Sequence, residues 1–500
     1  MKYNIFNTII SWVIKKRIHR INKFINKPIK SQNKLLKELV KKSKNTIWGK
    51  KYNYDKIYNY TDFQKKVPVQ SYEDIETYVN LIRSGHKKVL WKKKVLSLAK
   101  SSGTTNSKSK FIPITKDSLY NCHLKAGQDL ISIYVNQFPN TRIFSGKSLM
   151  IGGSNELEKN SKILSGDLSS ILIDNLPFWT KLISTPTKKI ALISNWEKKI
   201  EKMIPKIINQ DIRSISGVPS WTILLLKKIL QKTKKKTIQE IWPNLELYMH
   251  GGVSMSPYMN SFKKLIGKKI NYIEIYNASE GFFAIQNDLQ KNDLLLMLDY
   301  GIFYEFAHIV NGKESSEIIP LEKVQKNRNY AIIISTNGGL WRYKIGDTIK
   351  FTSLNPYKII ITGRTKHFIN CFGEEIMIHN TDLAIKIASE KTNSIVNDYT
   401  VAPLFFSNHS GCHEWIIEFN FAPKNLVEFT EILDSNLQKN NSDYEAKRSN
   451  DLLLKMPIIH VVENNFFYKW LKKRNRLGGQ NKIPRLSNDR KKINDLLKNI

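Results

Sequence analysis

A stretch of hydroxyl side chains around one glycine separates two apolar runs near residue 100: Ser101, Ser102, Gly103, Thr104 and Thr105. The flanking apolar residues predict two strands joined by a tight loop. Such a loop offers backbone N–H groups and hydroxyls to a polyphosphate, and Lys108 and Lys110 add positive charge. It is not a Walker loop, because no Gly-Lys-Ser/Thr opens a helix here. On its chemistry alone, the stretch fits either a phosphate-binding loop or a solvated hairpin turn.

Three further polar clusters follow three predicted strands in the central third of the chain. The strands are predicted over residues 212–217, 245–252 and 271–276, and helical patterns begin at Pro219 and at Ser256-Pro257. This alternation of strand and helix predicts a parallel sheet with crossover helices. Ligands in such sheets bind beyond the carboxyl ends of the strands. The three clusters, at 217–219, 250–252 and 278–281, are therefore expected to face one crevice.

Glycine and proline end strands in many proteins, so the clusters could simply be turns. Glu280 fits that reading poorly, because a carboxylate gains nothing from lying over an apolar sheet. Further strands are predicted at 330–335, 340–349 and 358–365, with a turn at 337–339. The likeliest domain boundary follows Arg364, and a late Gly-rich loop at 477–486 presents Lys482 before a proline.

Composition limits the class of protein. The 500 residues, 41% of them hydrophobic, suffice for a large core divided among several domains. No apolar run approaches the about 20 residues that a membrane helix needs. Residues 5–14 come closest, and they predict a packed or peripheral helix instead of a signal peptide.

Cysteine usage indicates a reducing compartment, and we expect a cytoplasmic protein. The three cysteines are far apart and form no CxxC pair. His409, Cys412 and His413 lie close in sequence but lack a fourth ligand at a recognisable spacing. We therefore expect an ordinary polar loop there and no metal site.

The formal net charge of +37 raises the possibility of nucleic-acid binding. The basic residues occur in short, dispersed clusters, such as 92–94, 234–236 and 472–474. Dispersed lysines usually form a solvated surface, so we expect no specific nucleic-acid partner. The charge should still steer anionic substrates toward the protein.

Taken in order, the motifs resemble the Gretchen Hagen 3 family of acyl-acid amido synthetases, and most closely its bacterial branch. This family belongs to the adenylate-forming superfamily, with acyl-CoA synthetases and luciferases. The resemblance covers essentially the whole chain and rests on residues 45–50, 63–69, 101–105, 250–253, 278–281, 340–343, 345–347, 363–365 and 479–485. It implies an α/β fold: a large N-terminal adenylation domain (1–365) with parallel and mixed sheets and crossover helices, and a smaller, mobile α+β C-terminal lid (366–500).

The resemblance also implies ATP and Mg²⁺ as cofactors and assigns roles within the site. Glu280 would bind the Mg²⁺, Asp347 the ribose hydroxyls, and Arg364, at the hinge, the nucleotide or its phosphates. Lys482 would arrive from the lid and stabilise charge on the reacting α-phosphate. The catalytic set would be Lys482, Arg364 and Thr105. The ATP and phosphate contacts would come from Ser101, Ser102, Gly103, Thr104, Thr105, Gly251, Gly252, Ser279, Asp347 and Arg364.

For the acyl group, the resemblance implies a pocket near residues 120–179. We expect Tyr120, Val218 and Tyr276 to contact the acyl group, although aromatic residues of this region are equally compatible with core packing. The chain departs from the family at two places. Asn106-Ser107 replace a favoured glycine in the phosphate loop, and Lys366 stands where relatives often carry an acid.

The resulting hypothesis is an ATP-dependent ligase that adenylates a small carboxylic acid and transfers the acyl group to an amino acid or similar amine. Catalysis would rest on positioning and charge stabilisation, without a covalent enzyme intermediate. One alternative is an acyl-CoA ligase on the same fold. Another, of a different class, is a basic protein that binds nucleic acid or an anionic surface and has an idle site. The sequence leaves the acyl acid, the amine and the oligomeric state open.

Overall fold

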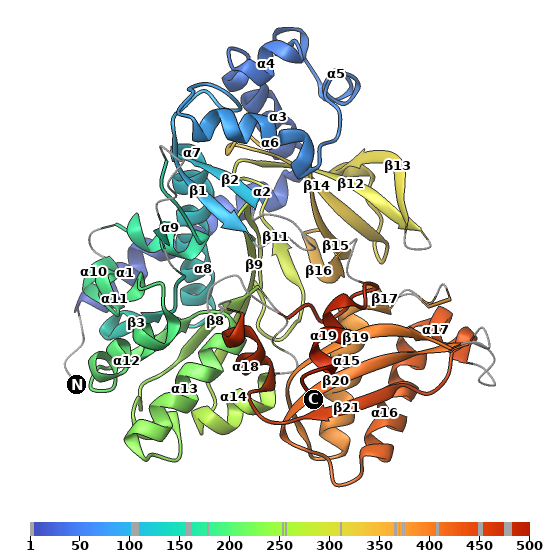
Figure 1. Ribbon diagram of the computed structural model, residues 1–500. Coiled ribbons are helices and arrows are strands. Elements are labelled where there is room, and N and C mark those ends of the chain that lie inside the picture. The colour runs from blue at the N-terminus through green and yellow to red at the C-terminus, as the bar shows by residue number, and fades with distance from the viewer. Residues whose placement is uncertain are drawn as a thin grey trace.

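The computed structural model describes the chain except for residues 1–4, 102–109, 154, 157–162, 178–179, 253–254, 256–257, 311–312, 365–367, 370, 373, 375, 407–409, 449–453 and 475–482. In the described part, N-terminal helices lead into a large mixed sheet with flanking helices, and a smaller α+β unit follows (Figure 1). None of the described helices is long and apolar enough to cross a membrane.

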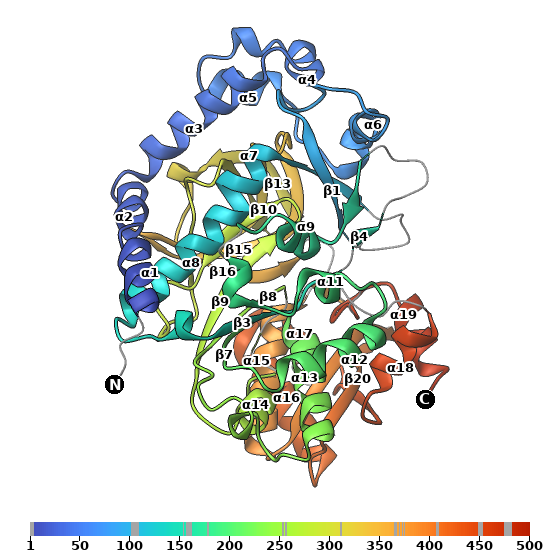
Figure 2. The same ribbon diagram turned by 90° about the vertical axis from the view of Figure 1, so that its left-hand side faces the viewer.

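A series of helices opens the described chain and wraps around one end of the molecule (Figure 2). Local capping fixes where several of them begin. The Thr46 side chain accepts a hydrogen bond from the N–H of Gly49, and Ser71 forms a capping box with Asp74. The helices are α1 (Ile5–Lys15), α2 (Ile18–Asn26), α3 (Pro28–Ser43), α4 (Ile47–Lys51), α5 (Tyr60–Lys66) and α6 (Tyr72–Arg83).

The large sheet has twelve strands in the order β13-β12-β14-β15-β16-β11-β10-β9-β8-β7-β3-β6. Their bounds are β3 (Lys147–Met150), β6 (Ser184–Thr185), β7 (Ile212–Ser216), β8 (Leu247–Gly251), β9 (Asn271–Ala278), β10 (Gly281–Ile285), β11 (Leu294–Leu296), β12 (Ile302–Val310), β13 (Lys313–Pro320), β14 (Asn329–Thr336), β15 (Tyr343–Leu354) and β16 (Tyr357–Arg364).

One part of this sheet is parallel, as the sequence predicts. Strands β6, β3, β7, β8 and β9 are joined by parallel pairings. The crossover helices include α12 (Trp196–Ile207), α13 (Pro219–Thr233) and α14 (Met259–Ile266). Apolar residues of these three helices and of the strands form one continuous core. The expected helix start at Ser256-Pro257 lies outside the described residues.

The other part of the sheet is antiparallel and includes the predicted strands β14, β15 and β16. Strand β15 begins at Tyr343, three residues later than predicted. Arg342 has a φ of 43°, which a β-strand cannot continue through. The segment 340–342 is therefore a buried turn that leads into the strand.

A second sheet of four strands, in the order β2-β1-β5-β4, lies beside the first (Figure 1). Strands β1 and β2 are antiparallel, and Ser101 pairs with Lys110 at their ends. The hydroxyl-rich stretch therefore joins two paired strands, as predicted. The strands are β1 (Val95–Ser101), β2 (Lys110–Thr115), β4 (Asn155–Glu156) and β5 (Ser165–Gly166). Helices of this region are α7 (Lys116–Ser118), α8 (Leu124–Gln137), α9 (Leu168–Asp174), α10 (Thr180–Ile183) and α11 (Lys188–Ala191).

The C-terminal unit follows β16 and has its own apolar core. In its three-stranded sheet, β19 and β20 are antiparallel, and β20 and β21 are parallel. Its elements are β17 (Phe368–Ile369), β18 (Ile376–Met377), α15 (Ile378–Lys391), β19 (Ile395–Phe405), β20 (Gly411–Phe421), α16 (Leu426–Asn440), α17 (Ser442–Arg448), β21 (Ile458–Val462), α18 (Phe466–Lys473) and α19 (Lys491–Leu497). The fold is thus the expected mixed α/β architecture with a smaller α+β C-terminal part.

Short helical turns complete the description. They span Tyr54–Lys56, Leu119–His123, Ile143–Ser145, Ile238–Glu240 and Leu321–Lys323.

Candidate active site

A cavity of about 1470 Å³ lies at the carboxyl edge of the parallel strands, against the C-terminal unit. The three polar clusters predicted to share a crevice all contribute to its wall: residues 217–218 after β7, 250–252 at the end of β8, and 278–280 at the end of β9. The C-terminal unit supplies the opposite wall, including His379, Asp382 and Arg485. The topology thus brings together residues that are far apart in the sequence.

Two glycines at the end of β8 are required by the backbone. A β-carbon on Gly251 would lie 2.5 Å from the carbonyl oxygen of Ile275 on the neighbouring strand. Gly252 has a φ of 80°, in the left-handed region that favours glycine. These constraints let the chain turn at the cavity wall without side chains that would fill it.

Asp347 and Arg364 form the charged centre of this wall. They lie opposite each other on β15 and β16, and the Nε of Arg364 donates to the Oδ1 of Asp347 at 2.7 Å. The hydroxyl of Tyr276, on β9, donates to the Oδ2 of Asp347 at 2.8 Å. Burial and the adjacent Asp347 raise the pKa of Tyr276 far above its ordinary value, so this hydroxyl keeps its proton. The carboxylate is therefore held in place by both partners.

Glu280 lies on the turn between β9 and β10 and lines the same cavity. Burial raises its pKa, and the nearby Asp347 acts in the same direction, whereas Arg364 opposes them. Burial destabilises the ionised form of this carboxylate, and a cation beside it would stabilise that form. The oxygen donors of Glu280 therefore fit a Mg²⁺ ion by their chemistry.

The structure places the remaining described candidates as follows. Ser279, 6% exposed, and Val218 both line the cavity. Tyr276 lines it too, but its hydroxyl is already bonded to Asp347. Tyr120 is 47% exposed and is not among the residues of the cavity wall, so the structure does not bring it to an acyl pocket here.

Several predicted site residues lie outside the described residues. They are Ser102, Gly103, Thr104, Thr105 and Lys482, together with Asn106, Ser107 and Lys366 at the two departures from the family. Ser101 ends β1, at the mouth of the loop. The roles expected for all of these residues stay predictions.

The segment just after Lys482 is firmly attached to the C-terminal unit. The hydroxyl of Thr400 donates to the carbonyl of Pro484 at 2.7 Å, and the N–H of Val401 donates to that of Arg485 at 2.8 Å. The Nη1 of Arg485 lies 2.5 Å from the Oδ1 of Asp382. Arg485 is 7% exposed and lines the cavity. These contacts anchor Pro484 and Arg485, which follow Lys482 in the sequence, to the C-terminal unit.

Sequence reasoning missed Arg485, although it lies in the same Gly-rich segment as Lys482. It also missed a fourth glycine-bearing strand end, Gly152-Gly153 after β3, which lines the cavity. The ammonium of Lys199, 2% exposed, donates to the carbonyls of Gly152 and Gly153 at 2.8 and 3.0 Å. Burial lowers the pKa of Lys199 to about 8. The signal was available, because an apolar run precedes this pair of glycines too.

Glu274, on β9, is a further acid in the cavity wall that the sequence did not single out. Burial raises its pKa to about 7, and Asp382 contributes in the same direction. Asp398, on the C-terminal unit, lines the same cavity, and its pKa is raised to about 6, again mainly by burial. Glu274 alternates with core residues along β9, so the local sequence did not indicate that its side chain would line a cavity shared with the C-terminal unit.

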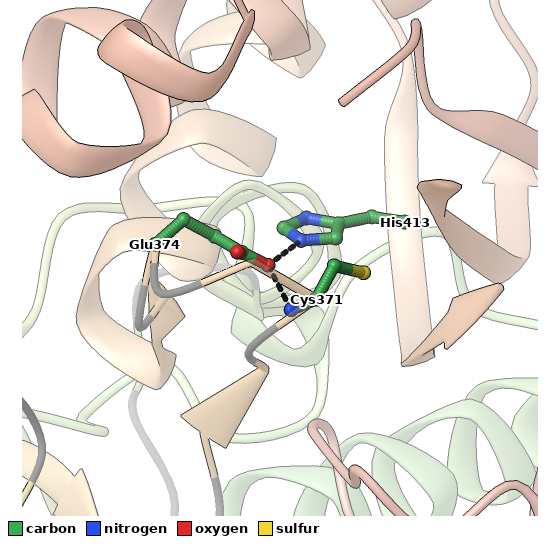
Figure 3. A group of neighbouring side chains, drawn as sticks. All are labelled: Cys371, Glu374 and His413. Carbon is green, nitrogen blue, oxygen red and sulfur yellow. Dashed lines mark hydrogen bonds and ion pairs between the residues drawn. The ribbon is translucent and has the colours of Figure 1, made fainter. Parts of the chain in front are cut away.

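Cys371, Glu374 and His413 form a group that could superficially hold a metal ion (Figure 3). The Oε1 of Glu374 accepts from the Nε2 of His413 at 2.8 Å and from the N–H of Cys371 at 2.5 Å; its Oε2 accepts from the N–H of Phe372 at 2.7 Å. Burial raises the pKa of the Cys371 thiol. The three hydrogen bonds tie Glu374 to β20 and to the backbone of the residues that precede it.

Three comparisons place this architecture among known proteins. The GH3 family N-terminal, central and C-terminal domain models match residues 17–270, 295–364 and 379–491. The jasmonoyl–L-amino acid synthetase JAR4 of Nicotiana attenuata is 21% identical over 450 residues, covering 76% of each chain. The indole-3-acetic acid-amido synthetase GH3.4 of Arabidopsis thaliana is 22% identical over 68% of this chain and 67% of its own.

Solved structures show the same fold. The GH3.15 acyl acid amido synthetase superposes with a TM-score of 0.79 at 15% identity, over 97% of this chain and 96% of its own. A 2-hydroxyisobutyryl-CoA ligase in a postadenylation state superposes with a TM-score of 0.61 at 12% identity, over 93% and 90%. The family models together span most of the chain and both walls of the cavity. The chain therefore belongs to the GH3 family.

Proposed function

We propose that this protein is an ATP-dependent ligase that joins a small carboxylic acid to an amino acid through an acyl-adenylate. One observation carries the proposal: the Asp347–Arg364 pair, Glu280 and the anchored segment at Arg485 meet in a single cavity. These groups come from four separate parts of the chain. Each suits one portion of an acyl-adenylate or its ATP precursor.

In the first half-reaction, the substrate carboxylate attacks the α-phosphorus of ATP, and pyrophosphate leaves. Asp347, held by Arg364 and Tyr276, accepts hydrogen bonds from the ribose hydroxyls. The hydroxyls and backbone N–H groups of residues 101–105 cradle the phosphates. Mg²⁺ held by Glu280 would neutralise phosphate charge. Lys482, carried in from the C-terminal unit, stabilises negative charge on the α-phosphate.

In the second half-reaction, the neutral amine attacks the carbonyl carbon of the mixed anhydride, the bond from that carbon to the phosphate oxygen breaks, AMP leaves, and the nitrogen gives up a proton to solvent. The C-terminal unit, proposed to begin near residue 366, acts as a lid that excludes water from the adenylate. Both acids and a lysine of this unit line the cavity, among them Asp398, Glu418 and Lys386. The charges of the cavity wall therefore do not favour an amine over CoA as the acceptor. The proposal of an amine rests on family membership.

The acyl group packs against apolar side chains of the cavity wall. Val218, which follows β7, is one of the lining residues. Apolar residues of the lining include Ile131, Phe144, Leu168, Leu172, Trp221 and Met255. We propose an apolar or aromatic acid as the substrate class. A cytoplasmic location belongs to the same proposal and agrees with the free cysteines Cys122, Cys371 and Cys412.

An ATP–pyrophosphate exchange screen over a panel of aliphatic and aromatic carboxylic acids tests the proposal. We expect exchange that depends on one acid class and on Mg²⁺. The variant Asp347→Ala should lower exchange by about 100-fold, as the loss of charged hydrogen bonds to a bound ligand does. Lys469→Ala, an exposed residue of α18, is the matched control and should leave exchange unchanged. Absence of exchange with every acid, together with undetectable ATP binding, would overturn the proposal.

A further inference from the structure

The outer surface of α1 carries an apolar patch that nothing else in the described chain covers. Ile9, Trp12 and Val13 are 55%, 61% and 53% exposed. They lie one turn apart on the helix and are followed by the exposed Lys16. Scattered apolar side chains are ordinary on protein surfaces, but three in one contiguous stripe are a sign of an interaction surface.

The opposite side of α1 packs against the rest of the protein. The exposure of the stripe therefore does not mean that the helix lacks tertiary contacts. The amide of Asn7 donates to a backbone carbonyl just beyond α8 at 3.1 Å, and Ile10 and Ile14 pack against the main core. At about 100° per residue, these three lie on one side of the helix and the exposed stripe on the other. Arg17, directly after α1, is paired at 2.7 Å with the buried Asp129 of α8. The helix is therefore held in a defined orientation.

One basic residue contacts the apolar stripe, and others follow on α2. The Nζ of Lys16 lies 3.3 Å from the centre of the Trp12 ring, a cation–π contact. Arg20 and Lys23, on α2, are exposed as well. The first acidic residue of the chain is Glu38. Figure 2 shows α1 and α2 together at the edge of the molecule, on its outer side.

From this geometry we infer that α1 and the start of α2 form a docking surface for a membrane that contains anionic lipids. A tryptophan between aliphatic residues and lysines is the composition of helices that lie in the membrane interface. The basic residues complement anionic headgroups. A stable protein interface needs about 800 Å² from each partner, which three side chains do not supply. A second copy of the chain is therefore the less suitable occupant.

Flotation of the full chain with lipid vesicles tests this inference. Vesicles of phosphatidylcholine and phosphatidylglycerol in equal parts are compared with pure phosphatidylcholine at moderate salt. Because the whole chain is strongly basic, binding to anionic vesicles alone would not locate the surface. The decisive variant is Ile9→Gln, Trp12→Gln and Val13→Gln, which removes the apolar stripe and keeps every charge.

We expect the wild type to float with the anionic vesicles and the Gln variant to bind at least about tenfold more weakly. A second variant, Lys16→Glu, Arg20→Glu and Lys23→Glu, should lose binding to a similar extent. Its matched control is Lys232→Glu, Lys235→Glu and Lys236→Glu, which changes net charge equally at exposed positions elsewhere and should retain most binding. All variants should keep the thermal unfolding midpoint and the pyrophosphate exchange of the wild type.

Two results would overturn the inference. One is equal flotation of the wild type and the Gln variant, which would mean that general basic charge binds the vesicles. The other is a wild-type protein that binds neither vesicle type but forms a dimer, which the Gln variant does not form. That outcome would assign the stripe to a second copy of the chain. Neither result depends on which reaction the cavity catalyses.

Discussion

Arg342 and Glu305 form a buried, two-pronged ion pair. The Nε of Arg342 lies 3.0 Å from the Oε2 of Glu305, and its Nη2 lies 2.9 Å from the Oε1, with both side chains at most 4% exposed. The same guanidinium donates to the carbonyls of Val67 and Gln64 in the N-terminal segment. Arg342 belongs to one of the motifs that carry the family resemblance, yet its contacts join two parts of the scaffold and it is not in the cavity wall.

Arg342→Met should therefore lower stability without a direct effect on nucleotide binding. Removing one partner of a buried pair leaves Glu305 uncompensated and costs about 3–5 kcal/mol. Urea unfolding measures the free energy of unfolding. The control Lys469→Met removes the exposed Lys469–Glu463 pair and should cost less than about 1 kcal/mol. A stable Arg342→Met protein that cannot bind ATP would contradict this assignment and would place Arg342 in the site.

Glu280→Gln should raise the Mg²⁺ concentration needed for adenylation by about tenfold or more, because the amide keeps the shape of the side chain but removes its charge. Pyrophosphate exchange titrated with Mg²⁺ measures the change. Burial raises the pKa of Glu280, so protons should compete with the ion and the Mg²⁺ requirement of the wild type should grow as the pH falls. Identical Mg²⁺ titrations for variant and wild type would exclude Glu280 as the ligand.

Lys482→Ala should slow adenylation by about 100-fold or more while ATP binding weakens little. Loss of a lysine that contacts the α-phosphate mainly in the transition state lowers the rate and leaves the affinity for ATP nearly unchanged. Calorimetric ATP binding and pyrophosphate exchange measure the two quantities separately. Lys473→Ala, in the last turn of α18, serves as the control, because it removes another lysine that is near Lys482 in the sequence. Equal losses in binding and rate would mean that Lys482 holds ground-state ATP.

The acceptor is predicted to be an amino acid and not the thiol of CoA. A mixed anhydride reacts readily with either nucleophile, so the choice depends on which one the closed cavity admits. The assay supplies pre-formed acyl-adenylate with either a mixture of amino acids or CoA, and mass spectrometry identifies the product. We expect amide with at least one amino acid and no thioester. Thioester without amide would leave only the adenylation half of the proposed function standing.

Local signals in the sequence determined much of the site-bearing sheet. Glycine or proline after β7, β8 and β9, and the helical spacing between them, were enough to predict parallel strands with a shared edge. Glu280, at one such strand end, was identified because a carboxylate is out of place over an apolar sheet. The spacing of apolar residues that marks a strand or a helix extends over only a few residues. It can therefore be recognised in the sequence without knowledge of the fold.

Tertiary structure alone decided which side chains are partners. Tyr276 and Asp347 are separated by 71 residues in sequence, and Arg485 and Asp382 by 103. Tyr120, by contrast, was expected in an acyl pocket and is instead exposed. The raised pKa of Glu274 likewise follows from its burial, to which the charge of Asp382 in the C-terminal unit adds. Burial and long-range charge depend on which distant segments come together, and no local pattern of residues encodes that.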